Sequence, residues 1–268
     1  HGQVARDMLR EAGHGYFDST HDALKVAAVL SLREEPEPAT PLAPAALPAD
    51  LPSGFLTEPD ARRLLESAGI PTTPWRLAHN AAQAVDAARE LGGPVVIKAV
   101  SARIVHKSDV GGVKLGIEGD EAVRQACDEI AAAARTAGVA ELDGFLVTQM
   151  WRADTELIAG VQRDPDFGPL VMVGAGGVLV ELLRDVQLAP APLSHATARA
   201  MVERLRCLPL LTGYRGRPKA DLDRIADVLV RLGQMAAAEG SRLRELDINP
   251  LFIAGDRVAA ADARATLA

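Results

Sequence analysis

The chain has 268 residues, of which 48% are hydrophobic and 24% are charged, and this composition excludes a largely disordered or collagen-like protein. Its 29 basic and 36 acidic residues give a net charge of −7, which argues against a general nucleic-acid-binding protein but allows a local basic site for a small anion. The two cysteines, Cys127 and Cys207, form neither a disulfide framework nor a zinc cluster, which fits a reducing cytoplasm, and no apolar run approaches the roughly 20 residues of a membrane helix.

The first 33 residues have the pattern of the end of an α/β unit. Apolar residues near Val4 suit one face of a helix, Gly13 breaks it, and a second helix is expected over 24–32. Because the chain starts inside a helix-like pattern without an initiator methionine, we expect it to be the C-terminal part of a longer protein. A semi-rigid extended linker is expected at 34–53, where six prolines exclude a helix or a central strand: Pro36, Pro38, Pro41, Pro44, Pro48 and Pro52.

The rest of the chain mixes helices and strands, which indicates an α/β or α+β fold. Its first helix is expected to begin at Thr57, whose spacing to Asp60 is that of a capping box, and to end at Gly69. The further elements expected in chain order are a helix at 81–91, a buried β-branched strand at 94–100, a polar loop at 101–112, a strand at 113–117, a helix at 120–137, strands near 144–150, 156–162 and 170–174, a glycine-rich loop before 178–183, helices at 195–207 and 220–239, and a hairpin at 243–264.

Lys98 lies in the apolar strand, where a buried ammonium group is costly unless it is paired. An isolated lysine of this kind usually reaches solvent from a strand edge, and the alternative is that it meets nucleotide phosphates. The loop at 106–113 favours the phosphates, because the adjacent Gly111 and Gly112 let backbone N–H groups approach an anion closely and Lys107 adds a donor.

His106 begins the same loop. A lone histidine is more often a surface or packed residue than a catalytic one. Beside a phosphate-binding loop it can instead be a nucleophile, since a neutral imidazole accepts a phosphoryl group.

The C-terminal hairpin indicates a cation site. A two-residue turn at Gly255–Asp256 places Asn249 opposite Asp262, and Asp247 shares their face. Three oxygen-bearing side chains on one face suit a hard cation such as Mg²⁺, although a solvated polar face gives the same pattern. Simple alternation puts apolar residues on both faces: Leu246, Ile248 and Phe252 on one, and Leu251 and Ile253 on the polar one. A hairpin this apolar is expected to be buried, and buried acids need a partner.

Two further segments give weaker signals. Glu156 follows a hinge-like segment, where it suits either the adenosine part of a nucleotide or a salt-bridged surface position. The glycines at 174–177 stand close to charged residues at 181–185, but tight turns use glycine for many reasons.

Five segments carry a resemblance to a known family: GGPVVIKAVS (92–101), IVHKSDVGGVKLGI (104–117), ELIAGVQRDPDFGPLVMVGAGGVLVELLRDV (156–186), LLTGYRGRP (210–218) and ELDINPL (245–251). In this order and spacing they resemble the ATP-grasp domain of NDP-forming acyl-CoA synthetases, typified by ADP-forming acetate–CoA ligase and, more distantly, by the β subunit of succinyl-CoA synthetase. Residues 1–33 resemble the end of the flavodoxin-like CoA-ligase domain of single-chain members. The resemblance therefore implies a CoA-ligase remnant at 1–33, a Pro-rich linker at 34–53 and an ATP-grasp domain of two subdomains at 54–268.

The resemblance also implies roles, position by position. Residues that match the nucleotide-binding positions are Lys98 and Lys107 with Gly111 and Gly112 at the phosphates, Thr148, Gln149 and Met150 at the adenine, and Glu156 beyond it. Asn249 and Asp262 match the Mg²⁺ ligands. The catalytic positions are Lys98, the neighbouring acid Asp247, and His106, which matches a histidine proposed as a second phosphoryl carrier.

The sequence departs from the family pattern just before Glu156. The family usually has a glycine there, whereas this chain has the segment Arg152–Thr155, with Asp154 two residues before the glutamate. We therefore expect the turn near the nucleotide, but not the fold, to differ from the family pattern.

The implied function is the nucleotide-binding, phosphoryl-transferring part of a cytoplasmic, magnesium-dependent ligase that interconverts acyl-CoA, ADP and phosphate with carboxylic acid, ATP and CoA through phosphohistidine. ATP or ADP and Mg²⁺ are expected to bind this chain, and CoA the upstream domains, which are its expected partners. No nucleic acid or membrane partner is expected, and a homo-oligomer is allowed.

Two alternatives remain at this stage: a ligand-sensing regulatory domain of a GNAT-type protein acetyltransferase, and a scaffold that binds no nucleotide. The acyl substrate, the physiological direction, the preference for ADP or GDP and the oligomeric state are left open.

Overall fold

A computed structural model describes residues 8, 24, 47–103, 110–177, 185–238 and 240–268. The chain divides into two units, His1–Pro38 and Ala39–Ala268, and the helices and strands named below all belong to the second. The parts predicted at 1–33 and 34–53 lie mostly outside the described residues, so these remain predictions. Among the described residues, no helix has both the length and the apolar character needed to cross a membrane.

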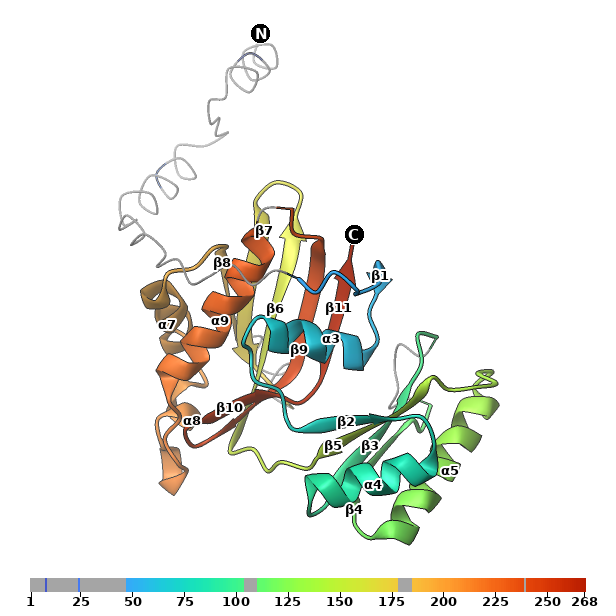
Figure 1. Cartoon of the computed structure of the whole chain (residues 1–268). Helices are drawn as coiled ribbons and strands as arrows, with labels where there is room; N and C mark the ends of the chain where they lie inside the picture. The colour runs from blue at the N-terminus through green and yellow to red at the C-terminus, as the bar shows by residue number, and fades with distance from the viewer. Residues whose placement is uncertain (1–7, 9–23, 25–46, 104–109, 178–184, 239) are drawn as a thin grey trace. The chain divides into compact units, whose positions relative to one another are not determined.

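The larger of two sheets has the strand order β1-β11-β9-β6-β7-β8, with β10 also paired to β9 (Figure 1). All its strand pairs are antiparallel. The strands are β1 (Gly54–Phe55), β6 (Thr155–Asp164), β7 (Gly168–Ala175), β8 (Val186–Pro190), β9 (Leu243–Ala254), β10 (Arg257–Ala260) and β11 (Ala263–Leu267). The predicted C-terminal hairpin therefore lies inside this sheet, where β9 pairs with β6, β10 and β11.

The smaller sheet has the order β2-β5-β3-β4 and is also antiparallel. Its strands are β2 (Trp75–Ala78), β3 (Val95–Val100), β4 (Val113–Ile117) and β5 (Gly144–Gln149). Two helices, α4 (Ala81–Leu91) and α5 (Asp120–Thr136), bury their apolar stripes against it in a core of their own. This separate core confirms the prediction of a mixed fold with two subdomains.

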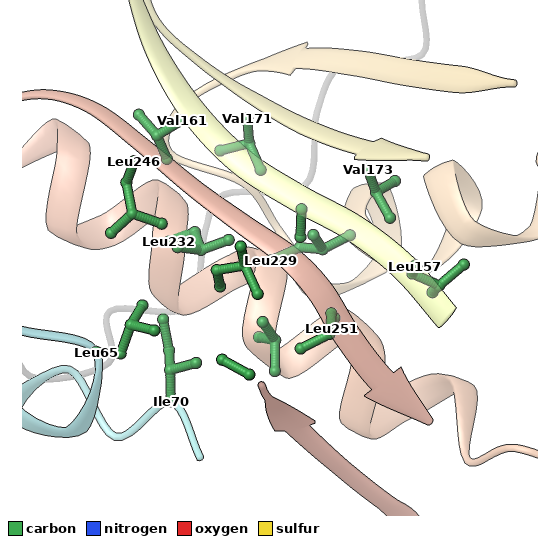
Figure 2. Close-up of a cluster of buried hydrophobic side chains, with 14 of the residues drawn as sticks. Leu65, Ile70, Leu157, Val161, Val171, Val173, Leu229, Leu232, Leu246 and Leu251 are labelled. Carbon is green, nitrogen blue, oxygen red and sulfur yellow. The ribbon is translucent and has the colours of Figure 1, made fainter. Parts of the chain in front are cut away.

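The remaining helices accompany the larger sheet, and all of them except the exposed 3₁₀ helix contribute residues to its core. They are α3 (Glu58–Ser67), α7 (His195–Glu203), α8 (Leu208–Leu211), the 3₁₀ helix η1 (Tyr214–Gly216) and α9 (Leu222–Ala237). Figure 2 shows side chains of β6, β7, β9 and α9 in this core, with two more from α3 and the segment after it: Leu157, Val161, Val171, Val173, Leu246, Leu251, Leu229, Leu232, Leu65 and Ile70.

The helix ends follow from local polar caps. Thr57 caps α3 by accepting a hydrogen bond from the Asp60 amide, and Pro59 lies in the first turn, as the sequence predicts. The helix predicted at 195–207 ends earlier, at Glu203, and the chain starts the short α8 at Leu208. The Cys207 amide donates to Asp185 Oδ2 at 2.9 Å and not to a carbonyl oxygen of the preceding turn, so the helix does not continue to residue 207.

The hairpin alternation predicted from the sequence is wrong at one point. Leu246 and Ile248 are buried as predicted, but Leu251 and Ile253 are buried too and do not continue the polar face. The register between β6 and β9 shifts between Leu157 and Ala159. This irregularity reverses which alternate residues of β9 point to the core, so both apolar sets are buried.

The two cysteines are free and buried. Burial raises the pKa of the Cys127 thiol to about 11. Burial, with Asp185 nearby, raises that of Cys207 to about 12. Thiols with such values are protonated at neutral pH, so these cysteines are packing residues without nucleophilic character.

The larger core gives a direct stability prediction. Leu229 of α9 is fully buried against the sheet, so Leu229→Ala is expected to lower the free energy of unfolding by about 2–5 kcal/mol. Leu188→Ala on β8 is the matched control, because that side chain is 62% exposed and its truncation is expected to change stability by less than about 0.5 kcal/mol. Urea unfolding followed by circular dichroism measures both, and equal losses in the two variants would contradict this description of the core.

Candidate functional site

Lys98 lies on β3 between β4 and β5 and is 7% exposed, so it does not reach solvent as an isolated edge lysine would. Its ammonium nitrogen Nζ lies 2.7 Å from Glu58 Oε1 and 2.8 Å from Asp262 Oδ2. The carbonyl oxygen of Ala261 accepts a third hydrogen bond at 3.2 Å. A lysine of the smaller sheet is thus hydrogen-bonded to the link between β10 and β11 of the larger sheet, where Asp262 lies.

Glu58 and Arg62, both on α3, complete this buried charged cluster, and the sequence analysis missed them. Arg62 is fully buried, and its Nε and Nη2 donate to Glu58 Oε1 at 3.2 and 3.1 Å. Its remaining donors reach the carbonyl oxygens of Thr73 and Ala261 and the Thr73 hydroxyl. The sequence signal that could have revealed them is their spacing. Glu58 and Arg62 are four residues apart, and Arg62 is three residues before Leu65, which places all three on one face of the helix.

Asn249 lies opposite Asp262, which confirms the hairpin register predicted from the turn. The Asn249 amide donates to the Asp262 carbonyl oxygen at 3.3 Å. The pairs on either side, Ala260 with Leu251 and Ala263 with Ile248, follow the same register.

Asp247 lies on the face of β9 that points away from the core, opposite Arg264 of β11 and Gly160 of β6. A Cβ atom at Gly160 would lie 2.4 Å from the Leu246 carbonyl oxygen, so this position next to Asp247 requires glycine. Burial is the main cause that raises the pKa of the Asp247 carboxyl group, and Asp262 adds to it. The two acids are therefore close enough to repel each other.

A Mg²⁺ ion fits this group of side chains. The donors are two carboxylates and an amide, which are the oxygen ligands that Mg²⁺ prefers, and a cation would relieve the repulsion between Asp247 and Asp262. Within the described ranges, no set of three or more His, Cys, Asp and Glu residues forms a metal site by itself. A cation here would therefore depend on the Asn249 amide and on oxygens of a ligand.

The glycine loop is described only at its end, because His106 and Lys107 lie outside the described residues. Gly111 has φ +70°, a left-handed conformation that favours glycine. The carbonyl oxygen of Gly112 accepts a hydrogen bond from the Ala99 amide at 2.8 Å. The end of the loop is thus fixed one residue from Lys98.

The segment predicted to meet adenine is held within the smaller sheet. Thr148 is buried, and the amides of Gln149 and Met150 donate to the carbonyl oxygens of Pro74 and Pro94 at 2.8 and 3.0 Å. These two amides are already bonded, so a base would have to use carbonyl oxygens or side chains of this segment. The Met150 side chain is 39% exposed and offers an apolar surface.

Asp154, the departure from the family pattern, has a structural role. Its Oδ2 accepts a hydrogen bond from the Gly255 amide at 2.9 Å, and its own amide donates to the Ile253 carbonyl oxygen at 2.8 Å. Its carbonyl oxygen accepts from Arg217 Nη1 at 2.6 Å. Asp154 thus holds the start of β6 to the turn between β9 and β10.

Glu156 lies exposed on β6, against the glycine-rich loop. The Gly176 amide donates to the Glu156 carbonyl oxygen at 2.9 Å, and a Cβ at Gly177 would lie 3.0 Å from Glu156 Oε2. The glycines therefore allow a close approach to this side chain. In the part of the chain that the structure describes, Glu156 forms no ion pair, which leaves its carboxylate open to a ligand.

Comparison with known proteins identifies the family. Residues 50–267 match the family described as ATP-grasp domain. The chain therefore belongs to the ATP-grasp family, which confirms the predicted fold.

More specifically, the chain is 41% identical over 213 residues to the β subunit of ADP-forming acetate–CoA ligase I from Pyrococcus furiosus, a match that covers 79% of this chain and 91% of that subunit. It is 39% identical to the trans-feruloyl-CoA synthase FCS1 of an unknown prokaryotic organism, over 96% of this chain but only 37% of that protein. The chain thus spans nearly all of a β subunit and about a third of a single-chain relative.

Solved structures of acetyl-coenzyme A synthetase 1 from Ca. Korarchaeum cryptofilum also match. A complex with coenzyme A, Ca-AMPCP and HgCl⁺ aligns with a TM-score of 0.76 at 39% identity, over 93% of this chain and 100% of that chain. A complex with coenzyme A and Mg-AMPPCP, whose phosphohistidine segment points towards the nucleotide binding site, aligns with a TM-score of 0.70 at 41% identity, over 80% of this chain and 93% of that chain. These relatives confirm the predicted resemblance and give no support to the regulatory-domain alternative.

The acid pair on β9 and β11 gives a stability prediction. A raised pKa means that the fold favours the protonated form of Asp247, so its ionisation lowers stability as pH rises through that pKa. Asp247→Asn, measured by urea unfolding at pH 7 with EDTA present, is expected to raise the free energy of unfolding, by less than about 1 kcal/mol because solvent screens the partly exposed group.

The gain in Asp247→Asn should shrink as the pH falls below the raised pKa of Asp247 and be lost at about pH 3, where the carboxyl group is mostly protonated in both the folded and the unfolded state. Asp86→Asn on α4 is the control, because that side chain is 75% exposed. A loss of stability at pH 7 would mean that attraction to Arg264 outweighs burial.

Proposed function

We propose that this chain binds ADP or ATP with Mg²⁺ and carries out phosphoryl transfer within an acyl-CoA synthetase reaction. In the overall reaction, acyl-CoA, ADP and phosphate are interconverted with carboxylic acid, ATP and CoA. The observation that carries the proposal is the 2.8 Å contact between Lys98 Nζ and Asp262 Oδ2, because it brings the predicted phosphate-binding cation to the predicted metal ligand. The family match supports the same assignment.

Lys98 and Asp262 suit a site for a magnesium nucleotide because each has a partner that a ligand can replace. A phosphate oxygen is an anionic acceptor for Lys98, as the Asp262 carboxylate is in the contact described above. Asp262 would then join Asn249 and Asp247 around the cation. When bound, Mg²⁺ would neutralise negative charge on the phosphates.

The other nucleotide contacts follow the predicted positions. Gly111, Gly112 and Lys107 would meet the phosphates, and the segment Thr148–Met150 the base. The bonded amides of Gln149 and Met150 favour recognition of the base through carbonyl oxygens and the Met150 side chain. The open carboxylate of Glu156 would accept hydrogen bonds from the sugar hydroxyls, since a carboxylate is an acceptor-only group.

His106 is proposed as the phosphoryl carrier of this chain. In the ATP-consuming direction, an imidazole nitrogen forms a bond to the γ-phosphorus, the bond from that phosphorus to the β–γ bridging oxygen breaks, and ADP leaves with the electron pair. Lys98 would stabilise the charge on the phosphoryl oxygens during this step. The phosphohistidine segment of the Korarchaeum enzyme, which points towards its nucleotide site, supports a histidine carrier in this family.

CoA and the acyl group are proposed to bind to other domains or a partner subunit. The Pyrococcus furiosus relative is a β subunit, and FCS1 is a single chain almost three times the length of the matched part. Phosphohistidine would connect the two chemistries, because a phosphoryl group on a carrier histidine can be received at one site and released at another.

Nucleotide binding tests the first part of the proposal. Lys98→Met is expected to weaken Mg-ADP binding by about 10- to 100-fold, because a charged hydrogen bond to phosphate contributes about 1.5–3 kcal/mol. Isothermal titration calorimetry with Mg-ADP measures the loss. Lys219→Met is the matched control, because that lysine is exposed and outside the proposed site. Equal affinities of the two variants and the unchanged chain would contradict the proposed phosphate contact.

Phosphorylation tests the carrier. The chain incubated with γ-labelled Mg-ATP is expected to gain acid-labile, base-stable label, and His106→Ala is expected to lose it while His195→Ala keeps it. His195 is an exposed residue of α7 near Asp223 and Asp227, so it controls for nonspecific labelling of a histidine. Retention of label in His106→Ala would place the phosphoryl group on another residue.

A further inference from the structure

The charged cluster reaches further into the protein than the nucleotide site needs. Lys98 and Asp262 belong to the proposed site, whereas Glu58 and Arg62 are on α3 and are 3% and 0% exposed. Burying two more charged groups is costly unless each is paired and hydrogen-bonded. Both groups meet this condition, since Arg62 and Lys98 donate to Glu58, and the pair thereby connects α3 to the lysine of the proposed site.

The hydrogen bonds define an order within the cluster. Arg62 donates to Glu58 through two nitrogens and to the Thr73 backbone and side chain through a third. These bonds fix the guanidinium plane, and the guanidinium in turn fixes Glu58 Oε1, the atom that accepts from Lys98. The Ala261 carbonyl oxygen accepts from both Arg62 and Lys98.

The two carboxylates that hold Lys98 differ in access. The Glu58 side chain is 1% exposed, whereas that of Asp262 is 30% exposed. Asp262 is also close enough to Asp247, where the cation is proposed, for their charges to interact. A ligand can therefore exchange with Asp262 but not with Glu58.

We propose that Glu58 and Arg62 are positioning residues for Lys98. Arg62 orients Glu58, and Glu58 holds the Lys98 ammonium group in place after Asp262 has turned to the magnesium nucleotide. Of the three donors of Lys98, two then stay on Glu58 and Ala261 and the third points to phosphate. This inference rests on the proposed function, since it assigns the two residues to the lysine of that same site.

Glu58→Gln keeps the shape of the side chain and removes its charge, so that among the described residues Asp262 is the one carboxylate that remains on Lys98. We expect Mg-ADP to bind about tenfold more weakly. Without the charge of Glu58, Lys98 pairs more strongly with Asp262, and the nucleotide displaces Asp262 less readily. In the Lys98→Met background the same change should have no further effect, because Glu58 acts through the lysine. The measurement is the Kd for Mg-ADP of the unchanged chain, both single variants and the double variant, by titration calorimetry.

Two further variants separate positioning from folding. Glu66→Gln changes an exposed glutamate on the same helix and is expected to bind Mg-ADP like the unchanged chain. Arg62→Lys keeps the cation but not the two-nitrogen contact with Glu58, so it is expected to give a smaller weakening, again absent with Lys98→Met. It serves as the test if Glu58→Gln does not fold, as judged by circular dichroism and the unfolding temperature.

A purely structural role predicts a different result. The positioning role would be overturned if Glu58→Gln or Arg62→Lys folds and binds Mg-ADP with normal affinity. It would also be overturned if either change lowers the affinity for Mg-ADP further in the Lys98→Met background. If Lys98→Met itself leaves Mg-ADP binding unchanged, the proposed function fails first and the positioning role with it.

Discussion

The contact of one ammonium group with two carboxylates organises this protein. Lys98 on the smaller sheet is held by Glu58 of α3 and by Asp262 between β10 and β11, so a buried charged cluster connects two sheets that have separate cores. Each group would be costly to bury alone, and the cluster is tolerated because its positive and negative charges balance. The same balance would make the proposed site responsive, because a ligand that brings phosphate and a cation would replace one ion pair with two.

Much of the fold was predictable because the local conformational preferences of the sequence agree with the tertiary structure. Caps such as Thr57 and β-branched runs such as 95–100 define helices and strands before any packing is known. The turn at Gly255–Asp256 fixes the hairpin register that pairs Asn249 with Asp262. Strict alternation failed after Ile248, because β9 has one residue more than β6 between the pairs Ala159–Ile248 and Leu157–Leu251. The sequence signal for this irregularity was Pro250, since a proline inside a strand marks an edge or a bulge.

The candidate site was predictable only where a residue stands out from its surroundings or matches the family. Lys98 is such a residue, as a cation in an apolar strand. Glu58 and Arg62 resemble ordinary helix-surface charges in the sequence, since their burial depends on Thr73, beyond the turn that follows α3, and on Ala261, 199 residues from Arg62. Asp154 similarly stood out as a missing glycine, but its partner Gly255 is 101 residues away and only the fold brings them together.

The connection between β5 and β6 has a consequence for ligand recognition. Gln149 and Met150 are hydrogen-bonded to one sheet, Asp154 to the other, and Arg257 lies over the Trp151 ring at 4.5 Å. Few backbone torsions in this connection are therefore left to freeze when a base arrives. Binding of a base at this edge, as proposed, would therefore lose little chain entropy. Selectivity between bases would come from the preorganised shape of the segment, into which a ring of the wrong shape does not fit.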